Sequence, residues 1–322
     1  MQNRSNLLVR VARKQFEASG IQTFEFVAAT GGILPPFSAG SHIEVHLPGG
    51  ITRSYSLFND PSEGHRYLIS VLRTVTSRGG SSAMHELVNE GDVLEISAPR
   101  NHFALASDAR RHLLIAGGIG VTPILCMAQR LAALQSSFDL HYCTRSVEST
   151  AFRALIAASP ALGKNVSFHF DDGAPEQQLD LKALLHPEQG THLYVCGPAG
   201  FMEAVLSTAR LQGWDEAALH YEYFSAGDAM AGPGSAFDVQ LASSGRVIKV
   251  DSNLTVVQAL QAAGVGITVS CEQGICGACL TRVIEGIPDH RDFYLTPDEQ
   301  AANDQFTPCC SRAKSARLVL DL

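Results

Sequence analysis

The sequence predicts a multidomain chain: an antiparallel β-barrel, then an α/β domain with a parallel sheet, then a smaller α+β domain. Three observations predict this order. Short alternating segments with frequent turns fill residues 1–105, strand–glycine turn–helix units follow from His112, and four regularly spaced cysteines lie near the end. At 322 residues the chain is too long for a single hydrophobic core of ordinary size, and its length suits two or three domains.

Composition narrows the class of protein. The chain is 45% hydrophobic, has no apolar run long enough to cross a bilayer, and begins without the apolar core of a signal peptide. We therefore expect a cytoplasmic protein with no membrane partner, in which the eight cysteines are metal ligands or buried thiols. The net charge of -8 and the absence of basic runs argue against nucleic-acid binding.

Residues 1–105 are expected to form the barrel, because short alternating strands are separated by turn clusters such as Pro48–Gly50. A helix is predicted at Ser82–Val88. The clearest predicted strands are Ile43–Leu47, Tyr67–Leu72 and Val93–Ile96.

Residues 106–224 are expected to form the α/β domain. An apolar run, His112–Ala116, meets a glycine turn and a helix that opens at Thr122–Pro123 and runs to Leu134. A second helix is predicted at Ala199–Leu211. Further central strands are predicted at Leu140–Cys143, Val166–Phe170 and Leu193–Cys196.

The third domain is predicted at residues 237–322, after a linker of small residues at 225–236. It opens with a hairpin, Phe237–Leu241 and Arg246–Val250, and a helix is expected at Thr255–Ala263.

Four cysteines in this domain have the spacing C-x4-C-x2-C, followed by twenty-nine residues and a further C. This spacing holds a plant-type 2Fe-2S cluster and predicts a ferredoxin-like β-grasp fold. A structural zinc site is the chemical alternative, but such sites favour C-x2-C pairs on both sides. The predicted ligands are Cys271, Cys276, Cys279 and Cys309.

The fourth ligand has a neighbour of the same type, Cys310. We expect both residues on a strand, where adjacent side chains point to opposite faces, so that only one reaches the iron. The gap of twenty-nine residues favours Cys309, with Cys310 assigned to packing.

A flavin site is suggested in the barrel by Arg53-Ser54-Tyr55-Ser56, together with Gly80-Ser81 before the predicted helix. Arginine binds phosphate bidentately, and amides at a helix N-terminus bind anions. Tyr55 would lie against the flavin ring, with the Ser56 hydroxyl near its reactive nitrogen. Alone, this string also fits an ordinary strand with a half-buried tyrosine.

Two glycine turns mark a nucleotide site at the carboxyl edge of the parallel sheet. Gly117-Gly118-Ile119-Gly120-Val121-Thr122-Pro123 departs from the G-x-G-x-x-G fingerprint, because Pro123 replaces the third glycine. Cys196-Gly197-Pro198 closes a later strand. The alternative for the first motif is an ordinary strand-to-helix turn with proline in the first helical position.

Taken in order along the whole chain, these motifs resemble the phthalate dioxygenase reductase family, which includes reductases similar to that of vanillate O-demethylase. The resemblance implies FMN as flavin and NADH as electron source. It implies that Arg53, Ser54, Tyr55, Ser56, Gly80 and Ser81 bind FMN, that Phe224 stacks near its ring, and that Gly118, Gly120, Thr122, Cys196 and Gly197 border the nicotinamide and pyrophosphate. Ser56 and Thr122 are the candidate catalytic residues.

Arg145, after the second strand of the α/β domain, bears on the choice of nucleotide. A basic residue there can bind the 2'-phosphate of NADP, whereas an acidic one favours NAD. NADH remains our expectation because Glu148 and the pair Asp171-Asp172 can receive the ribose.

The implied function is the reductase component of an aromatic oxygenase or demethylase, with a Rieske-type terminal oxygenase as partner. Electrons would pass from NADH through FMN and the cluster. A stand-alone reductase of ferric chelates or quinones uses the same machinery and stays open. A non-catalytic redox sensor, which would keep the cluster without turnover, is the alternative of another class.

Overall fold

The structure is a computed structural model that describes residues 6–74, 79–224, 234–269, 271–272 and 274–322. Residues 225–233 of the predicted linker therefore lie outside the described part. The chain divides into two compact units, residues 1–224 and 225–322. Within the described residues, no helix is both long and apolar enough to cross a bilayer.

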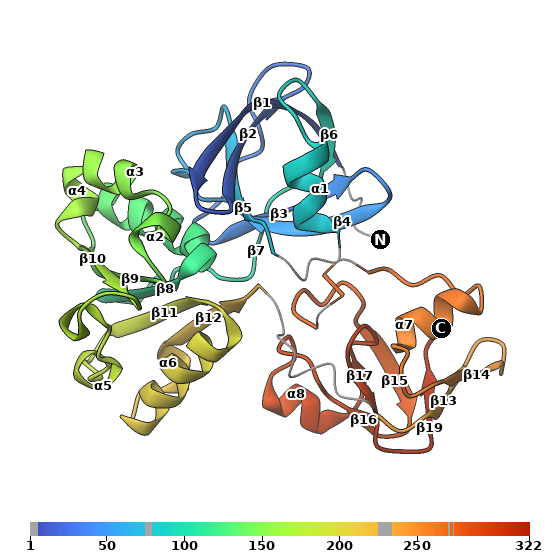
Figure 1. The fold of residues 1–322 in the computed structure, drawn as a ribbon. Helices are drawn as coiled ribbons and strands as arrows, with labels where there is room; N and C mark the ends of the chain where they lie inside the picture. The colour runs from blue at the N-terminus through green and yellow to red at the C-terminus, as the bar shows by residue number, and fades with distance from the viewer. Residues whose placement is uncertain (1–5, 75–78, 225–233, 270, 273) are drawn as a thin grey trace. The chain divides into compact units, whose positions relative to one another are not determined.

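The first unit begins with an antiparallel barrel, which confirms the predicted fold of this region (Figure 1). Its strand order is β4-β3-β6-β1-β2-β5, β7 pairs with β3, and a bridge from Leu57 to Ile69 brings the two ends together. The strands are β1 Leu7–Ala18, β2 Ile21–Ala28, β3 Ser41–Leu47, β4 Ile51–Ser56, β5 Tyr67–Leu72, β6 Val93–Ile96 and β7 Arg100–Asn101.

One helix, α1 at Gly80–Leu87, covers the barrel and starts two residues earlier than predicted. Gly79 precedes it with φ of 88°, a left-handed conformation that glycine adopts without strain. Ala83 and Met84 are buried in the barrel core, so packing of this face holds the helix in place.

The unit continues with a five-stranded sheet of order β10-β9-β8-β11-β12, in which every pairing is parallel. This confirms the predicted α/β fold class. The strands are β8 Arg111–Gly117, β9 Ser137–Thr144, β10 Val166–Phe170, β11 Thr191–Gly197 and β12 Leu219–Tyr223.

Helices cover both faces of this sheet, with α2, α3 and α4 on one side and α5 and α6 on the other (Figure 1). The helix predicted from Thr122 begins at Val121, directly after a 3-10 turn at Gly118–Gly120, so Pro123 stands within its first turn. The helices are α2 Val121–Ala133, α3 Arg153–Ala158, α4 Pro160–Gly163, α5 Leu181–Leu184 and α6 Ala199–Leu211, with further 3-10 turns at Val147–Ser149, Pro175–Gln177 and Glu216–Ala218.

The second unit is an α+β fold on a mixed sheet of order β14-β13-β19-β15-β17, with a separate pair of β16 and β18. Thr255 and Thr296 cap its two helices, and in each case the side-chain oxygen accepts a backbone N–H three residues on. The elements are β13 Phe237–Leu241, β14 Val247–Val250, α7 Val256–Ala262, β15 Thr281–Glu285, β16 Pro288–Asp289, α8 Pro297–Ala302, β17 Gln305–Phe306, β18 Arg312–Ala313 and β19 Arg317–Leu320.

Candidate functional site

The structure brings the two parts of the predicted flavin motif together. A Cβ placed on Gly80 would lie 2.6 Å from Cγ and 2.8 Å from Nε of Arg53, so the arginine side chain packs directly on the first residue of α1. Ser81 follows in the helix, and its Oγ lies 3.2 Å from Oγ1 of Thr74. A guanidinium and a helix N-terminus at one place fit an anionic phosphate.

The other residues of this strand point to two faces. Tyr55 is partly buried against the barrel core, and burial raises the pKa of its phenol. The buried hydroxyl of Ser54, on the opposite face, has no hydrogen-bond partner among the described residues. An unpartnered buried hydroxyl fits a ligand that supplies acceptor oxygens, but alternation along the strand directs it to the face opposite Arg53.

Ser56, at the end of β4, meets a carboxyl group from the far end of the parallel sheet. Its Oγ donates to Glu222 Oε2 at 3.3 Å, and Glu222 Oε1 lies 4.0 Å from Nδ1 of His42. His42 is the register partner of Ser56 on β3. The three side chains therefore form one largely buried polar group where the barrel meets β12, with the side chain of Glu222 15% exposed.

Burial shifts both titratable members of this group toward their neutral forms. Desolvation raises the pKa of Glu222 to about 7, opposed by the hydrogen bond from Ser56. The pKa of His42 falls to about 4, chiefly through desolvation and next through His102. Near neutral pH the carboxyl of Glu222 can thus hold or release a proton beside Ser56 Oγ.

The two glycine turns of the nucleotide domain lie against each other. A Cβ on Gly120 would be 2.3 Å from the carbonyl oxygen of Cys196 and 2.7 Å from the amide nitrogen of Gly197. Only glycine allows this approach, which sets both turns at the carboxyl edge of β8 and β11. This edge is where ligands of such sheets bind.

Cys196 is fully buried and pairs in register with Glu222 on the neighbouring strand. Desolvation, and secondly the charge of Glu222, hold the pKa of this thiol well above its usual value. The thiol of Cys196 is therefore a neutral group rather than a thiolate nucleophile.

The remaining predicted nucleotide contacts are spread around this edge. Thr122 is buried, and its hydroxyl donates to the carbonyl of Ile119 at 3.2 Å. Its side chain therefore stabilises the first turn of α2. Gly118 has φ of 53° and open space around it. Arg145 is exposed beyond β9, and Phe224, at the end of the unit, is 36% exposed.

In the second unit the four predicted cysteine ligands form two pairs. The thiols of Cys271 and Cys276 hydrogen-bond each other, which raises the pKa of Cys276. A second bond joins Cys279 and Cys309, lowering the pKa of Cys279 and raising that of Cys309. Within the described residues, no three His, Cys, Asp or Glu side chains converge to hold a single metal ion. Two pairs of thiols fit a binuclear core, in which each iron takes two thiolates.

The predicted strand at the fourth cysteine is wrong. Cys309 and Cys310 lie in a turn after β17, because the amides of Cys310 and Ser311 both donate to the carbonyl of Thr307. The two thiols hydrogen-bond each other and differ in their other contacts. Cys309 is buried and accepts the N–H of Gly274 at 3.3 Å, whereas Cys310 is partly buried and lies 3.2 Å from Oγ1 of Thr307.

Sequence reasoning missed Glu222 and gave His42 no role. Tyr221-Glu222-Tyr223 looks like an exposed alternating strand, and His42 like one of several strand histidines. The available signal was the position of Glu222, two residues before Phe224 at the carboxyl end of the domain's final strand, the edge that carries the nucleotide turns.

Comparisons with known proteins agree with this geometry. Residues 239–314 match the family of 2Fe-2S iron-sulfur cluster binding domains, and residues 97–219 match the N-terminal domain of dimethylamine monooxygenase subunit DmmA-like proteins. The chain is 53% identical over 315 residues to vanillate O-demethylase oxidoreductase of a Pseudomonas species, covering 98% of this chain and 99% of that one.

Two further relatives extend the likeness. The reductase subunit of phthalate 4,5-dioxygenase from Pseudomonas putida is 40% identical over 98% of this chain and 96% of its own. The solved structure of phthalate dioxygenase reductase, described as modular for electron transfer from pyridine nucleotides to [2Fe-2S], is 39% identical. It covers 99% of this chain and 98% of its own with a TM-score of 0.79.

Fold and site together define an iron–sulfur oxidoreductase that carries a nucleotide-binding sheet and a flavin-type barrel. The chain belongs to the family of oxygenase reductases that includes vanillate O-demethylase oxidoreductase and phthalate dioxygenase reductase. The predicted resemblance, the fold class and the 2Fe-2S domain are confirmed.

Proposed function

We propose that this chain is the NADH-dependent reductase component of a Rieske-type oxygenase or demethylase acting on an aromatic compound. The observation that carries the proposal is the meeting of Ser56, Glu222 and Cys196 where the barrel adjoins the carboxyl edge of the parallel sheet. A flavin held by the barrel and a nicotinamide held by the sheet share this junction. The names of the relatives support the oxygenase partner.

Each group of residues is assigned a binding role by its position in the fold. Arg53, Gly80 and Ser81 bind the FMN phosphate, and Tyr55 and Phe224 border the ring. The Gly118–Thr122 turn and Cys196–Gly197 hold NADH, with Arg145 near its ribose. FMN, when bound, supplies the conversion of a two-electron hydride donor into single-electron transfers, and the cluster relays the electrons.

Ser56 and Glu222 act on protons at this junction. The Ser56 hydroxyl would give its proton to a flavin nitrogen and take one from the Glu222 carboxyl in exchange, or move protons the opposite way, so that Ser56 stays a neutral hydroxyl. Thr122 is proposed to act through its backbone position in the turn that adjoins the nicotinamide.

The proposed domain limits follow the same assignment. Residues 1–105 bind FMN, 106–224 bind NADH and 237–322 bind the cluster through Cys271, Cys276, Cys279 and Cys309, with 225–236 as linker.

An anaerobic visible spectrum tests the proposal. Purified protein should release FMN on denaturation, and NADH should bleach its flavin and cluster bands; intact bands would favour a redox sensor. Turnover is then compared between a Rieske-type oxygenase and simple acceptors. Efficient reduction of ferric chelates or quinones without transfer to any such oxygenase would favour a stand-alone reductase.

A further inference from the structure

The second unit contains a fully buried carboxyl group that neither the cluster ligands nor the proposed function uses. Asp292 lies in the loop between β16 and α8, and its side chain has 0% exposure. Carboxyl groups are rarely buried to this extent unless several donors satisfy them. Its partners therefore indicate what it holds together.

Asp292 accepts hydrogen bonds on both oxygens. Oδ2 accepts the N–H of Leu295 at 2.8 Å, and Oδ1 accepts the hydroxyl of Ser311 at 3.2 Å. Nδ1 of His290 lies 3.7 Å from the same Oδ1, and neither ring nitrogen of His290 has a hydrogen-bond partner among the described residues. The carboxyl group thus joins its own loop to the segment that follows the fourth cysteine.

The backbone around Asp292 rests on the cysteine loop. Phe293 N–H donates to the carbonyl of Gly274 at 3.0 Å, and Gly274 N–H donates to Cys309 Sγ. A Cβ on Gly274 would lie 2.9 Å from Cβ of Asp292 and 2.4 Å from Sγ of Cys310. Gly274 is therefore enclosed between Asp292 and the turn that carries Cys309.

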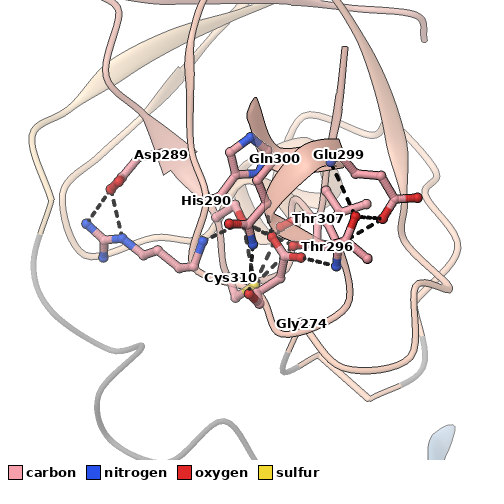
Figure 2. Close-up of polar contacts among 12 residues, drawn as sticks. Gly274, Asp289, His290, Thr296, Glu299, Gln300, Thr307 and Cys310 are labelled. Atoms are coloured by element: carbon pink, nitrogen blue, oxygen red, sulfur yellow. Dashed lines mark hydrogen bonds and ion pairs between the residues drawn. The ribbon is translucent and has the colours of Figure 1, made fainter. Parts of the chain in front are cut away.

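Ser311 extends the connection to that turn. Its hydroxyl accepts the N–H of Arg291 at 3.1 Å and lies 3.0 Å from Oγ1 of Thr307, which contacts Cys310. Figure 2 shows Gly274, Thr307 and Cys310 close together in this network. The Asp292 carboxyl group thus bonds the turn that carries Cys309, while the Asp292 backbone and the N–H of Phe293 contact Gly274 in the cysteine loop.

We propose that Asp292 is a positioning residue for the 2Fe-2S cluster. Its segment clamps the cysteine loop at Gly274 against the Thr307–Ser311 turn, and its buried negative charge lowers the cluster's reduction potential. The charge acts because an electron added nearby in a medium of low dielectric is repelled. The inference rests on the cluster assignment and extends the proposed function by naming a residue that tunes the second carrier.

The charge is tested by Asp292→Asn in the full-length protein, with Asp289→Asn as matched control. Asp289 lies three residues away but is partly exposed and paired with Arg291. Redox titration with dithionite, followed by electron paramagnetic resonance, should show a more positive cluster midpoint in Asp292→Asn and the wild-type value in Asp289→Asn. An unchanged midpoint in Asp292→Asn would overturn the electrostatic role.

The clamp is tested separately by Ser311→Ala, which keeps the charge and removes the hydroxyl that bonds Asp292, the N–H of Arg291 and Thr307. Loss of iron to a chelator should be at least about tenfold faster than in wild type, since the bond to the charged group alone accounts for a change of that size. If Ser311→Ala loses iron at the wild-type rate, the proposed clamp is excluded. This measurement still decides the question if Asp292→Asn fails to assemble a cluster. Since dithionite replaces NADH, failure of the proposed function would leave both readouts intact.

Discussion

Ser56 Oγ lies 3.3 Å from Oε2 of Glu222, although 166 positions separate the two residues in the sequence. The pair joins the last residue of β4 to β12, and so joins the barrel to the parallel sheet. A proton held between them lies where the flavin and the nicotinamide are proposed to react.

Removing the Ser56 hydroxyl should slow the first chemical step. In Ser56→Ala, NADH should reduce the flavin about tenfold more slowly, as expected for one lost hydrogen bond to a reacting group. Anaerobic stopped-flow absorbance measures the rate. Ser62→Ala removes an exposed turn hydroxyl as a control. Equal rates in both variants would exclude a role for Ser56 in the step.

The raised pKa of Glu222 predicts how the free energy of unfolding depends on pH. Burial raises its pKa to about 7 from an ordinary 4.5, so the folded protein binds a proton that the unfolded chain has released. Its contribution to the free energy of unfolding therefore falls as pH rises from 4.5 to 7, by up to ~3 kcal/mol.

Glu222→Gln should remove this dependence. The variant should match wild type near pH 5 and be more stable at pH 8, and calorimetry at the two values gives the difference. His42, whose lowered pKa acts in the opposite direction, is present in both proteins. An identical pH profile in both proteins would show that Glu222 titrates normally.

The close approach of the two glycine turns predicts a sharp contrast between two alanine substitutions. Gly120→Ala places a methyl group against the backbone of Cys196 and Gly197, and should cost ~1–3 kcal/mol of stability and weaken NADH binding. Gly200→Ala, in α6 with nothing within 4 Å, should be neutral or slightly stabilising. Thermal denaturation and nucleotide titration measure both effects.

The adjacent cysteines can be told apart by iron and sulfide analysis. Cys309→Ser should lose most of the cluster, because its buried thiol pairs with that of Cys279. Cys310→Ser should retain it, since a serine hydroxyl can replace the thiol beside Thr307. Retention in the first variant and loss in the second would reverse the assignment.

Arg145 predicts how the enzyme discriminates between nucleotides. We expect NADH to be preferred, with Arg145 supporting residual use of NADPH. Arg145→Gln should lower kcat/KM for NADPH about tenfold and leave that for NADH nearly unchanged, because one phosphate contact is removed. Arg13→Gln, an exposed arginine on β1, is the control. A parallel loss with both nucleotides would argue for a general structural effect.

Local patterns were enough to predict most of the fold and part of the site. The cysteine spacing and the turn at Gly117–Gly120 are contiguous signals, because short loops must supply several ligands or amides at once. Glu222 and Asp292 could not be assigned in this way. Each is an ordinary acidic residue in the sequence, and its burial arises only from packing between distant segments.

The boundary errors have the same origin. The turn at Cys309–Cys310 looks like a strand in sequence, but its conformation depends on the carbonyl of Thr307, which accepts two amides. Glycine at 79 and 80 concealed the start of α1, because glycine is a poor helix former unless a ligand site or a close contact requires it.

The position of β19 affects when the iron–sulfur centre can be assembled during protein synthesis. This strand lies between β13 and β15 in the sheet, yet it is translated after all four cysteines. While the ribosome is still adding residues beyond Cys310, all four cysteines have been translated but their supporting sheet lacks its central strand. Iron and sulfide delivered to such a nascent chain would meet an incomplete scaffold, so cluster insertion should follow rather than accompany elongation through Leu320.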